Sequence, residues 1–264
     1  MKESTDYRPL SGHKVFSTIV AWAIVTLVVA VIVISLSTPA VVRKPATRRT
    51  VCLNNVRNIG LALLNYADTS RGNVFPPAYF PDQKQTALHS WRAAIVGFLD
   101  QPAVARKYRW GEAWNGPHNS RLAQELPVWG FHCPNDPDDA SHTSYVVVVG
   151  ANTLFPGTKS RGPKDIRRAG GAGDTILVFE LPQSGVHWMQ PVDLKYEDAV
   201  RGLGISGQPF SSAHPGGIGA DAVINVCFAD GHAQAIPLAE FAEFVKKHAR
   251  IDDRSEPVPD NSTP

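Results

Sequence analysis

Three residues in the last quarter of the chain have side chains that could bind a metal ion or transfer protons. His214 precedes Pro215, and Asp230 and His232 lie on either side of Gly231. Imidazole and carboxylate groups are common zinc ligands and the usual acid–base groups of enzymes. In the structural interpretation, which we favour, Asp230 serves a turn and His214 caps the preceding loop through hydrogen bonds. The sequence therefore predicts no metal and no cofactor, with His214, Asp230 and His232 as weak candidates.

A short acidic stretch offers oxygen ligands of the kind that Ca²⁺ prefers. Asp136, Asp138 and Asp139 lie close together along the chain, and clustered carboxylates are typical calcium ligands. A solvated acidic loop is the commoner explanation of such a stretch, and it is the one we adopt.

The sequence lacks the signatures of several enzyme classes. No Gly-x-Ser-x-Gly segment is present, and Cys133 lies beside Pro134 without a nearby predicted base. The glycines between Gly170 and Gly173 lack the Lys-Ser/Thr ending and the preceding strand of a phosphate-binding loop, so a turn explains them better. We predict that the protein is not an enzyme.

The three cysteines, Cys52, Cys133 and Cys227, allow at most one disulfide within the chain. None has CxxC spacing, which disfavours a zinc or redox motif. Cys227 lies in an apolar run and is predicted to be a small core residue. Cys52 and Cys133 flank polar, turn-rich sequence, so they are the candidate disulfide if the domain lies outside the cytoplasm.

The composition is that of one globular domain with an additional apolar segment. The chain has 264 residues, of which 43% are hydrophobic, and its formal net charge is +2. Its basic residues are spread along the sequence rather than gathered on one predicted face, which argues against a nucleic-acid partner.

The apolar segment is predicted to be a membrane-spanning helix at residues 15–37, after a tail at 1–14. Residues 15–36 carry no charge, and roughly 20 apolar residues span a bilayer as a helix. The alternatives are a cleaved signal peptide, whose apolar core is usually shorter, and a buried helix, which would have a polar face. The lipid bilayer is thus a predicted partner. Lys and Arg are nearly balanced across the segment and do not decide its orientation.

The remainder is predicted to be an α+β head domain at 38–250, followed by a disordered tail at 251–264. Apolar residues repeat at helical spacing along 48–69, which predicts a helix with one face docked on a sheet. A short helix is expected at 90–99 and an amphipathic one at 238–247. Strands are expected at 144–149, 175–180 and 223–228. The last is expected to end in the turn Ala229-Asp230-Gly231 and to form a hairpin with 232–236, because Asp-Gly tolerates the positive φ angles that a two-residue turn needs.

Several segments, in this order, resemble the large pilin-like family catalogued as DUF1559, whose members look like type II secretion pseudopilins with an enlarged head. The likeness runs from about residue 36 to residue 236. The matching segments are 38–41, 48–55, 59–63, 65–66, 75–77, 90–92, 114–117, 133–137, 143–146, 173–177, 214–217 and 228–231.

The resemblance implies a long N-terminal helix, half in the membrane and half packed on an antiparallel sheet. It also implies a cytoplasmic N-terminus, a single pass through the inner (cytoplasmic) membrane and a periplasmic head. Members usually begin with a Gly-Phe processing site and a Glu at the fifth mature position. Here Gly12 is followed by His13, and the fifth residue after Gly12 is Ser17.

Two functional hypotheses follow. The first is a membrane-anchored pilin-like envelope protein with a structural or assembly role, whose partners are other envelope or pilin-like proteins. The second is a static, membrane-anchored periplasmic binding module that reuses the pilin-like fold.

Overall fold

The computed structural model describes residues 12–37, 45–214 and 222–252, and it divides the chain into two compact units, 1–44 and 45–264. The first unit contains helix α1 (Gly12–Ser37). The large apolar side chains described on α1 are exposed, among them Phe16, Trp22 and Leu27. Within the described residues, no helix is both long enough and apolar enough to cross a membrane. The span at 15–37 therefore stays a prediction.

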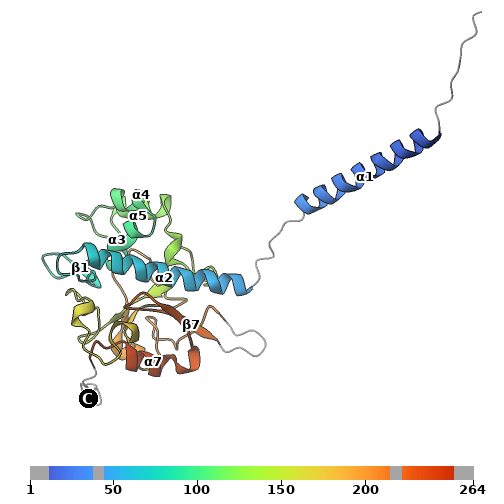
Figure 1. Cartoon of the computed structure of the whole chain (residues 1–264). Helices are drawn as coiled ribbons and strands as arrows, with labels where there is room; N and C mark the ends of the chain where they lie inside the picture. Colours follow the sequence, from blue (N-terminus) through green and yellow to red (C-terminus); the bar gives the residue numbers. More distant parts are fainter. Residues whose placement is uncertain (1–11, 38–44, 215–221, 253–264) are drawn as a thin grey trace, which may run out of the picture. The chain divides into compact units, whose positions relative to one another are not determined.

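The second unit is built around helix α2 (Pro45–Thr69), which matches the helix predicted at 48–69. Proline is favoured in the first turn of a helix, where no amide partner is lost. Cys52, Val56, Ile59 and Leu63 are fully buried, as their spacing predicts for a docking face. Figure 1 shows α2 running between the sheet that contains β7 (Val223–Phe228) and the part of the head that carries α3 (Trp91–Ile95), α4 (Pro102–Lys107) and α5 (Pro117–Glu125).

The sheet under α2 has four strands in the order β3-β5-β7-β8, and every neighbouring pair is antiparallel. Its strands are β3 (Tyr145–Val146), β5 (Ile176–Glu180), β7 (Val223–Phe228) and β8 (Ala233–Pro237). Helix α7 (Phe241–His248) contributes Phe241 and Val245 to a second apolar cluster with the strands. This arrangement confirms the predicted α+β class.

Gly60 allows α2 to lie unusually close to β7. A Cβ atom at this position would overlap the sulfur of Cys227 and lie 3.2 Å from its Cβ. Cys227 is fully buried and has a free thiol, which matches its predicted place in the core. Burial raises the pKa of this thiol to about 12, so Cys227 stays protonated and unreactive at neutral pH.

We expect Gly60→Ala to lower the free energy of unfolding by about 2 kcal/mol, because overpacking a core outweighs the gain in helix propensity. Urea unfolding followed by tryptophan fluorescence measures the change. Gly60→Ala/Cys227→Ala should recover part of the loss, since the overlapping sulfur is gone. Gly111→Ala is the control, because a Cβ there meets nothing within 4 Å. Equal effects of Gly60→Ala and Gly111→Ala would contradict the prediction.

The single strand predicted at 144–149 is wrong, because the run divides between two sheets. β3 pairs antiparallel with β5, whereas β4 (Val148–Val149) pairs parallel with β6 (Leu194–Lys195). Val147 separates them, and its amide donates to Asp193 Oδ1 at 3.0 Å. An unbroken β-branched run indicates extended backbone, but a buried carboxylate takes the hydrogen bond that a continuous strand would need.

The hairpin of β7 and β8 forms as predicted, with Ala229, Asp230 and Gly231 in its turn, which makes a three-residue loop rather than the two-residue type. Phe228 donates its amide to His232 O at 2.9 Å, which leaves three residues in the loop. Gly231 is the loop residue with a positive φ, 90°. A three-residue loop ending in a left-handed glycine is the next commonest hairpin connection.

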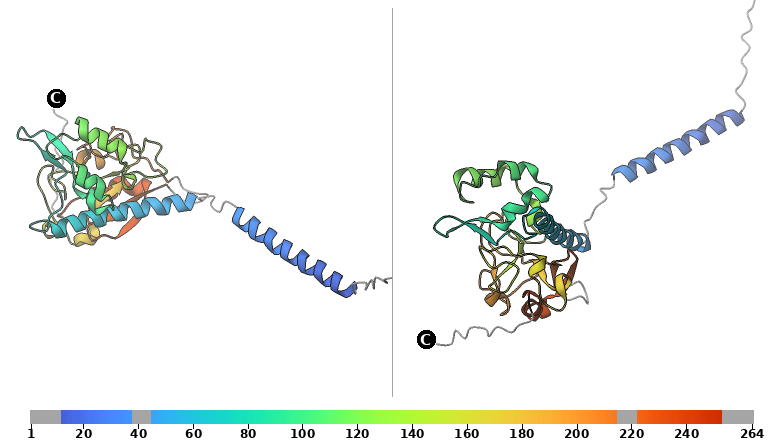
Figure 2. Two further views of the ribbon diagram at one scale, coloured as in Figure 1. Left: turned by 90° about the horizontal axis from the view of Figure 1, so that it is seen from above. Right: turned by 60° about the vertical axis from the view of Figure 1, so that its left-hand side comes forward.

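The rest of the head consists of short elements, and Figure 2 shows them wrapped around α2 and the sheet. The short helix predicted at 90–99 is α3 continued by η1, and the amphipathic helix predicted at 238–247 is η5 followed by α7. Ile251 is 7% exposed and pairs with Asn152, so the head extends past the predicted boundary at 250. Most of the predicted tail lies outside the described residues. The remaining elements are β1 (Tyr79–Pro81), β2 (Ala87–Ser90), α3 (Trp91–Ile95), η1 (Val96–Phe98), α4 (Pro102–Lys107), α5 (Pro117–Glu125), η2 (Trp129–Phe131), η3 (Pro163–Asp165), η4 (Gly171–Asp174), α6 (Tyr196–Ala199) and η5 (Leu238–Glu240).

Candidate functional site

A disulfide joins the beginning of α2 to the loop that follows η2, far along the chain. The structure pairs Cys52 with Cys133, which follows η2, across a sequence separation of 81 residues and with Cα atoms 5.4 Å apart. Both side chains are fully buried. Ser144 Oγ accepts a hydrogen bond from the Cys133 amide at 2.8 Å, and Tyr145 donates its hydroxyl to Cys52 O at 3.3 Å. The bond therefore fixes α2 to the loop that leads into the sheet.

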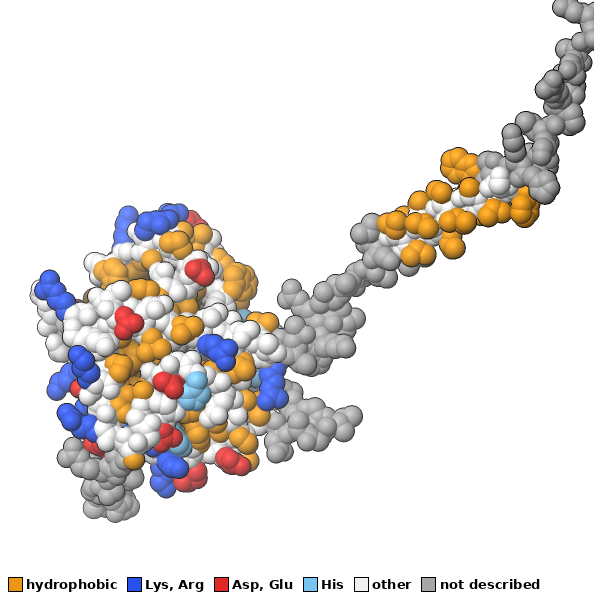
Figure 3. Space-filling view, in the orientation of Figure 1, with side chains coloured by type: hydrophobic (Ala, Val, Ile, Leu, Met, Phe, Trp, Pro, Cys, Tyr) orange, Lys and Arg blue, Asp and Glu red, His pale blue; other side chains and the backbone are white. Residues whose placement is uncertain are grey.

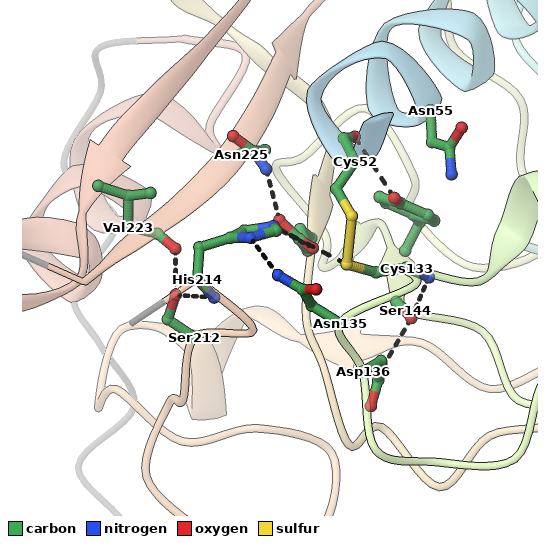
Figure 4. Close-up of polar contacts among 12 residues, drawn as sticks. Cys52, Asn55, Cys133, Asn135, Asp136, Ser144, Ser212, His214, Val223 and Asn225 are labelled. Carbon is green, nitrogen blue, oxygen red and sulfur yellow. Dashed lines mark hydrogen bonds and ion pairs between the residues drawn. A yellow bond between two sulfur atoms is a disulfide. The ribbon is translucent and has the colours of Figure 1, made fainter. Parts of the chain in front are cut away.

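His214 lies against this disulfide. Its backbone pairs with Val223 at the start of β7, and its amide donates to Ser212 Oγ at 2.9 Å. The ring nitrogen Nε2 lies 3.8 Å from Cys133 Sγ and 3.0 Å from Glu180 Oε1. Figure 4 shows the imidazole between β7 and the yellow disulfide, with Cys52 at the end of the α2 ribbon.

Two amides complete the surroundings of the imidazole and the carboxylate. Asn135 Nδ2 lies 3.2 Å from His214 Nδ1, and Asn225 donates Nδ2 to Glu180 Oε2 at 2.7 Å. With Asn135 as donor, Nδ1 accepts and Nε2–H donates to Glu180, so this set of bonds fits the neutral imidazole. The orientation of each amide is inferred from this network.

The site places a carboxyl group in the interior with few partners. Glu180 is 1% exposed, and its side chain meets His214 and Asn225 rather than a lysine or arginine. Burial raises the pKa of Tyr145 well above its usual value, and the neighbouring Glu180 carboxylate adds to the rise. A buried carboxylate is costly unless it is paired, hydrogen-bonded or bound to a metal.

The predicted trio of His214, Asp230 and His232 is not assembled. His214 lies at the start of β7 and the other two follow its end, so roughly 20 Å of strand separates them. Asp230 and His232 are exposed and bond to each other, with His232 Nδ1 2.6 Å from Asp230 Oδ1. Burial alone would raise the pKa of Asp230, but hydrogen bonds from His232 lower it overall. Asp230 thus acts in the turn, as the structural interpretation expects.

The carboxylates of the acidic stretch accept hydrogen bonds in the turns around them. Asp136 is 7% exposed and accepts from Ser144 Oγ at 2.7 Å and from the Gln183 amide at 3.1 Å. Asp138 accepts from a backbone amide as well. Hydrogen bonds from Ser141 lower the pKa of Asp139. Asp136 and Asp138 thus connect this loop to the segment after β5, and Asp139 accepts within its own turn.

In the part of the chain that the structure describes, one group of metal-ligand side chains comes together. Its members are Cys52, Cys133, Glu180 and His214, whose ligand atoms all lie within 4.8 Å of one another and are all buried. Only His214 was a metal candidate in the sequence. Sequence reasoning missed Glu180 and Asn225. Asn225 interrupts the otherwise apolar β7, and Glu180 ends the otherwise apolar β5, which was the available signal.

A second buried polar centre supports the fold. Arg92 donates Nη2 to Asp193 Oδ1 at 2.6 Å, and the two side chains are 0% and 2% exposed. Asp193 also accepts from Trp91 Nε1 at 3.0 Å and from the Val147 amide. Arg92 donates to Tyr145 O as well. Burial lowers the pKa of Arg92 and raises that of Asp193, while their mutual attraction opposes both changes.

One comparison with known proteins gives a match. A family model, SBP_bac_10, described as "Protein of unknown function (DUF1559)", matches residues 43–203, which is more than half of the chain. This match confirms the resemblance to DUF1559 that the sequence segments indicate. No curated protein and no solved structure matches the chain.

Proposed function

Because the chain belongs to the DUF1559 family, we propose that it is a membrane-anchored, pilin-like envelope protein with a structural or assembly role rather than an enzymatic one. The observation that carries the proposal is the disulfide between Cys52 and Cys133, which fixes α2 to a head built on an antiparallel sheet. This disulfide supports both the proposed location of the head outside the cytoplasm and the proposed pilin-like architecture.

The compartment follows from the chemistry of the disulfide. Disulfides persist in oxidising environments such as the bacterial periplasm and are rare in the cytosol. A buried Cys52–Cys133 bond is therefore expected in a head on the outer side of the cytoplasmic membrane, with the N-terminus in the cytoplasm. This orientation is the one that the family resemblance implies, and the charges around the apolar segment do not oppose it.

The anchor is supported by the sequence and by exposed apolar surface. Residues 15–36 are uncharged. Large apolar side chains are exposed at positions that point all around α1, and orange side chains cover the visible face of this helix in Figure 3. Exposed apolar surface on this scale indicates contact with a membrane or a partner protein. We propose that residues 15–37 lie in the bilayer.

The architecture of the head supports the pilin-like part of the proposal. One helix, α2, buries an apolar stripe on a four-stranded antiparallel sheet. In a protein of this kind, α2 is the part of the head that follows the membrane anchor along the chain. The Cys52–Cys133 disulfide and the packing of α2 on the sheet would therefore attach the rest of the head to the anchor. The proposed partners are the bilayer and other envelope or pilin-like proteins.

The alternative is a static, membrane-anchored binding module, and the N-terminal residues favour it. Gly12 is followed by His13, and Ser17 occupies the fifth position, where pilin-like members carry Glu. Without that carboxylate a filament lacks the group that helps to set its register. The two functions differ in whether the N-terminus is processed.

We expect the native protein to stay in washed membranes, and its head to be digested by protease added to spheroplasts. Val25→Arg/Val28→Arg should release the protein from the membrane, because each charge at a bilayer centre costs roughly 3 kcal/mol. Val51→Arg is the matched control on α2, where the wild-type side chain is exposed. A washed-off wild-type protein, or a head protected in spheroplasts, would overturn the proposal.

Mass spectrometry of the intact N-terminal peptide separates the two functions. A new terminus at His13, especially a methylated one, supports processing and assembly into a filament or pseudopilus. A terminus at Met1 or the residue after it supports the static anchor.

A further inference from the structure

We propose that reduction of the Cys52–Cys133 disulfide turns the buried cluster of Cys52, Cys133, Glu180 and His214 into a zinc site. The inference concerns the chemistry of the head alone and does not depend on a membrane anchor or on assembly. It rests on the types of the four side chains, on their distances and on their burial.

The donor types fit Zn²⁺. Thiolate, imidazole and carboxylate are its three protein ligands, and four-coordinate sites with two cysteines are common structural sites. The ligands here come from four separate segments: α2, the loop after η2, strand β5, and the residue that pairs with the start of β7. Spacing along the chain therefore gives no motif, which explains why the sequence disfavoured zinc.

Two distances already approach those of a tetrahedral site. Bonds of about 2.0–2.3 Å to zinc place a nitrogen and an oxygen ligand about 3.4 Å apart, and a sulfur and a nitrogen ligand about 3.6 Å apart. His214 Nε2 lies 3.0 Å from Glu180 Oε1 and 3.8 Å from Cys133 Sγ. The two sulfurs would need to separate to about 3.8 Å, which reduction permits.

The surroundings supply the outer contacts of such a site. Asn225 holds Glu180 Oε2 at 2.7 Å and leaves Oε1 directed at the imidazole. With Nε2 bound to zinc, the imidazole proton resides on Nδ1, which faces Asn135. Rotation of that amide brings its oxygen to Nδ1, the usual outer partner of a metal-bound histidine. The buried Glu180 carboxylate would then have a cation to pair with.

The redox and proton balance is simple. A dithiol reductant attacks one sulfur, the bond between Cys52 and Cys133 breaks, and the second thiol of the reductant closes its own disulfide. Two electrons pass to the protein, and each cysteine gains a proton. Zinc then displaces the two thiol protons into solvent, so binding weakens as the pH falls. Oxidised protein has no thiolate to offer and should not bind.

The test uses the full-length chain in detergent, reduced with a dithiol and then exchanged into buffer that contains Zn²⁺ alone. We expect one zinc per chain in the reduced protein and none in the oxidised protein, measured by elemental analysis after removal of free metal. With Co²⁺ as the probe, thiolate-to-cobalt absorption should appear in the reduced protein only. His214→Ala and Glu180→Gln should each lower the affinity for zinc at least tenfold.

Cys227→Ala is the matched control and should keep full binding, because Cys227 is buried away from the cluster behind Gly60. His232→Ala is the second control, since it removes the exposed histidine of the hairpin. Circular dichroism follows the fold of every sample. Recovery of the folded signal on adding zinc to reduced protein supports the site. Reduced protein without stoichiometric zinc, or with equal binding in His214→Ala, would overturn it.

Discussion

Replacing Asp193 by alanine is expected to lower the free energy of unfolding by about 3–5 kcal/mol, which approaches half the stability of a typical domain. The variant leaves the Arg92 guanidinium in the interior without its carboxylate. It also removes the acceptor of the Trp91 indole and of the Val147 amide.

The expected loss of stability is large because Arg92 and Asp193 are buried, and not simply because they form an ion pair. The Arg92 side chain is 0% exposed and that of Asp193 is 2% exposed. A charge that loses its partner in the interior bears the full cost of desolvation, whereas an exposed charge is solvated by water. The carboxylate also fixes the point at which the run from Tyr145 to Val149 divides between two sheets.

A matched control is available on the surface. Asp198 pairs with Arg201 at 2.7 Å, but their side chains are 33% and 63% exposed, so Asp198→Ala should cost less than about 1 kcal/mol. Asp193→Asn keeps the shape of the side chain and one hydrogen-bond acceptor. Its loss in the free energy of unfolding should therefore lie between the losses of the other two variants. Urea unfolding of the full-length chain measures all three. A loss for Asp193→Ala no larger than that for Asp198→Ala would contradict this account.

The second large effect is expected from the disulfide. Cys52→Ala/Cys133→Ala should lower the free energy of unfolding by about 4 kcal/mol, because a bond that closes a loop of 81 residues restricts the unfolded chain. Both sulfurs are buried, so some lost packing adds to this figure. Part of the effect should appear as fraying of the first turns of α2, where Cys52 lies.

Thermal unfolding measures the loss of global stability, and hydrogen exchange of the α2 amides measures the fraying of the first turns of this helix. Reduction of the wild type in metal-free buffer should reproduce the double variant. Cys227→Ala controls for the loss of a buried sulfur and should cost about 1 kcal/mol. A double variant as stable as Cys227→Ala would show that the disulfide does not hold the helix to the head.

Features set by local pattern could be predicted from the sequence. The stripe from Cys52 to Leu63 identified α2 and its buried face, because helical spacing alone decides which side chains share a face. The hairpin at β7 and β8 followed from an apolar run and an Asp-Gly pair. The family followed from many short segments in a constant order, and the pairing of Cys52 with Cys133 was the favoured one of three.

Features that depend on contact between segments distant along the chain could not be predicted from the sequence. The turn type at Asp230 depends on the register of β7 and β8, and the division of the run around Val147 depends on Asp193, far along the chain. Asp193 itself has no local signal, since its importance comes from Arg92, about a hundred residues earlier. His214 was placed with Asp230 and His232 because they are near in sequence.

The tertiary structure instead places His214 with Cys133 and Glu180. Residues close along a strand can be far apart in space, since each adds about 3.3 Å. Residues from four segments can meet when a sheet and a helix close over them. For this protein, local sequence pattern specified α2, the hairpin of β7 and β8 and the disulfide candidates. Packing of α2 on the sheet determined which polar groups share the interior.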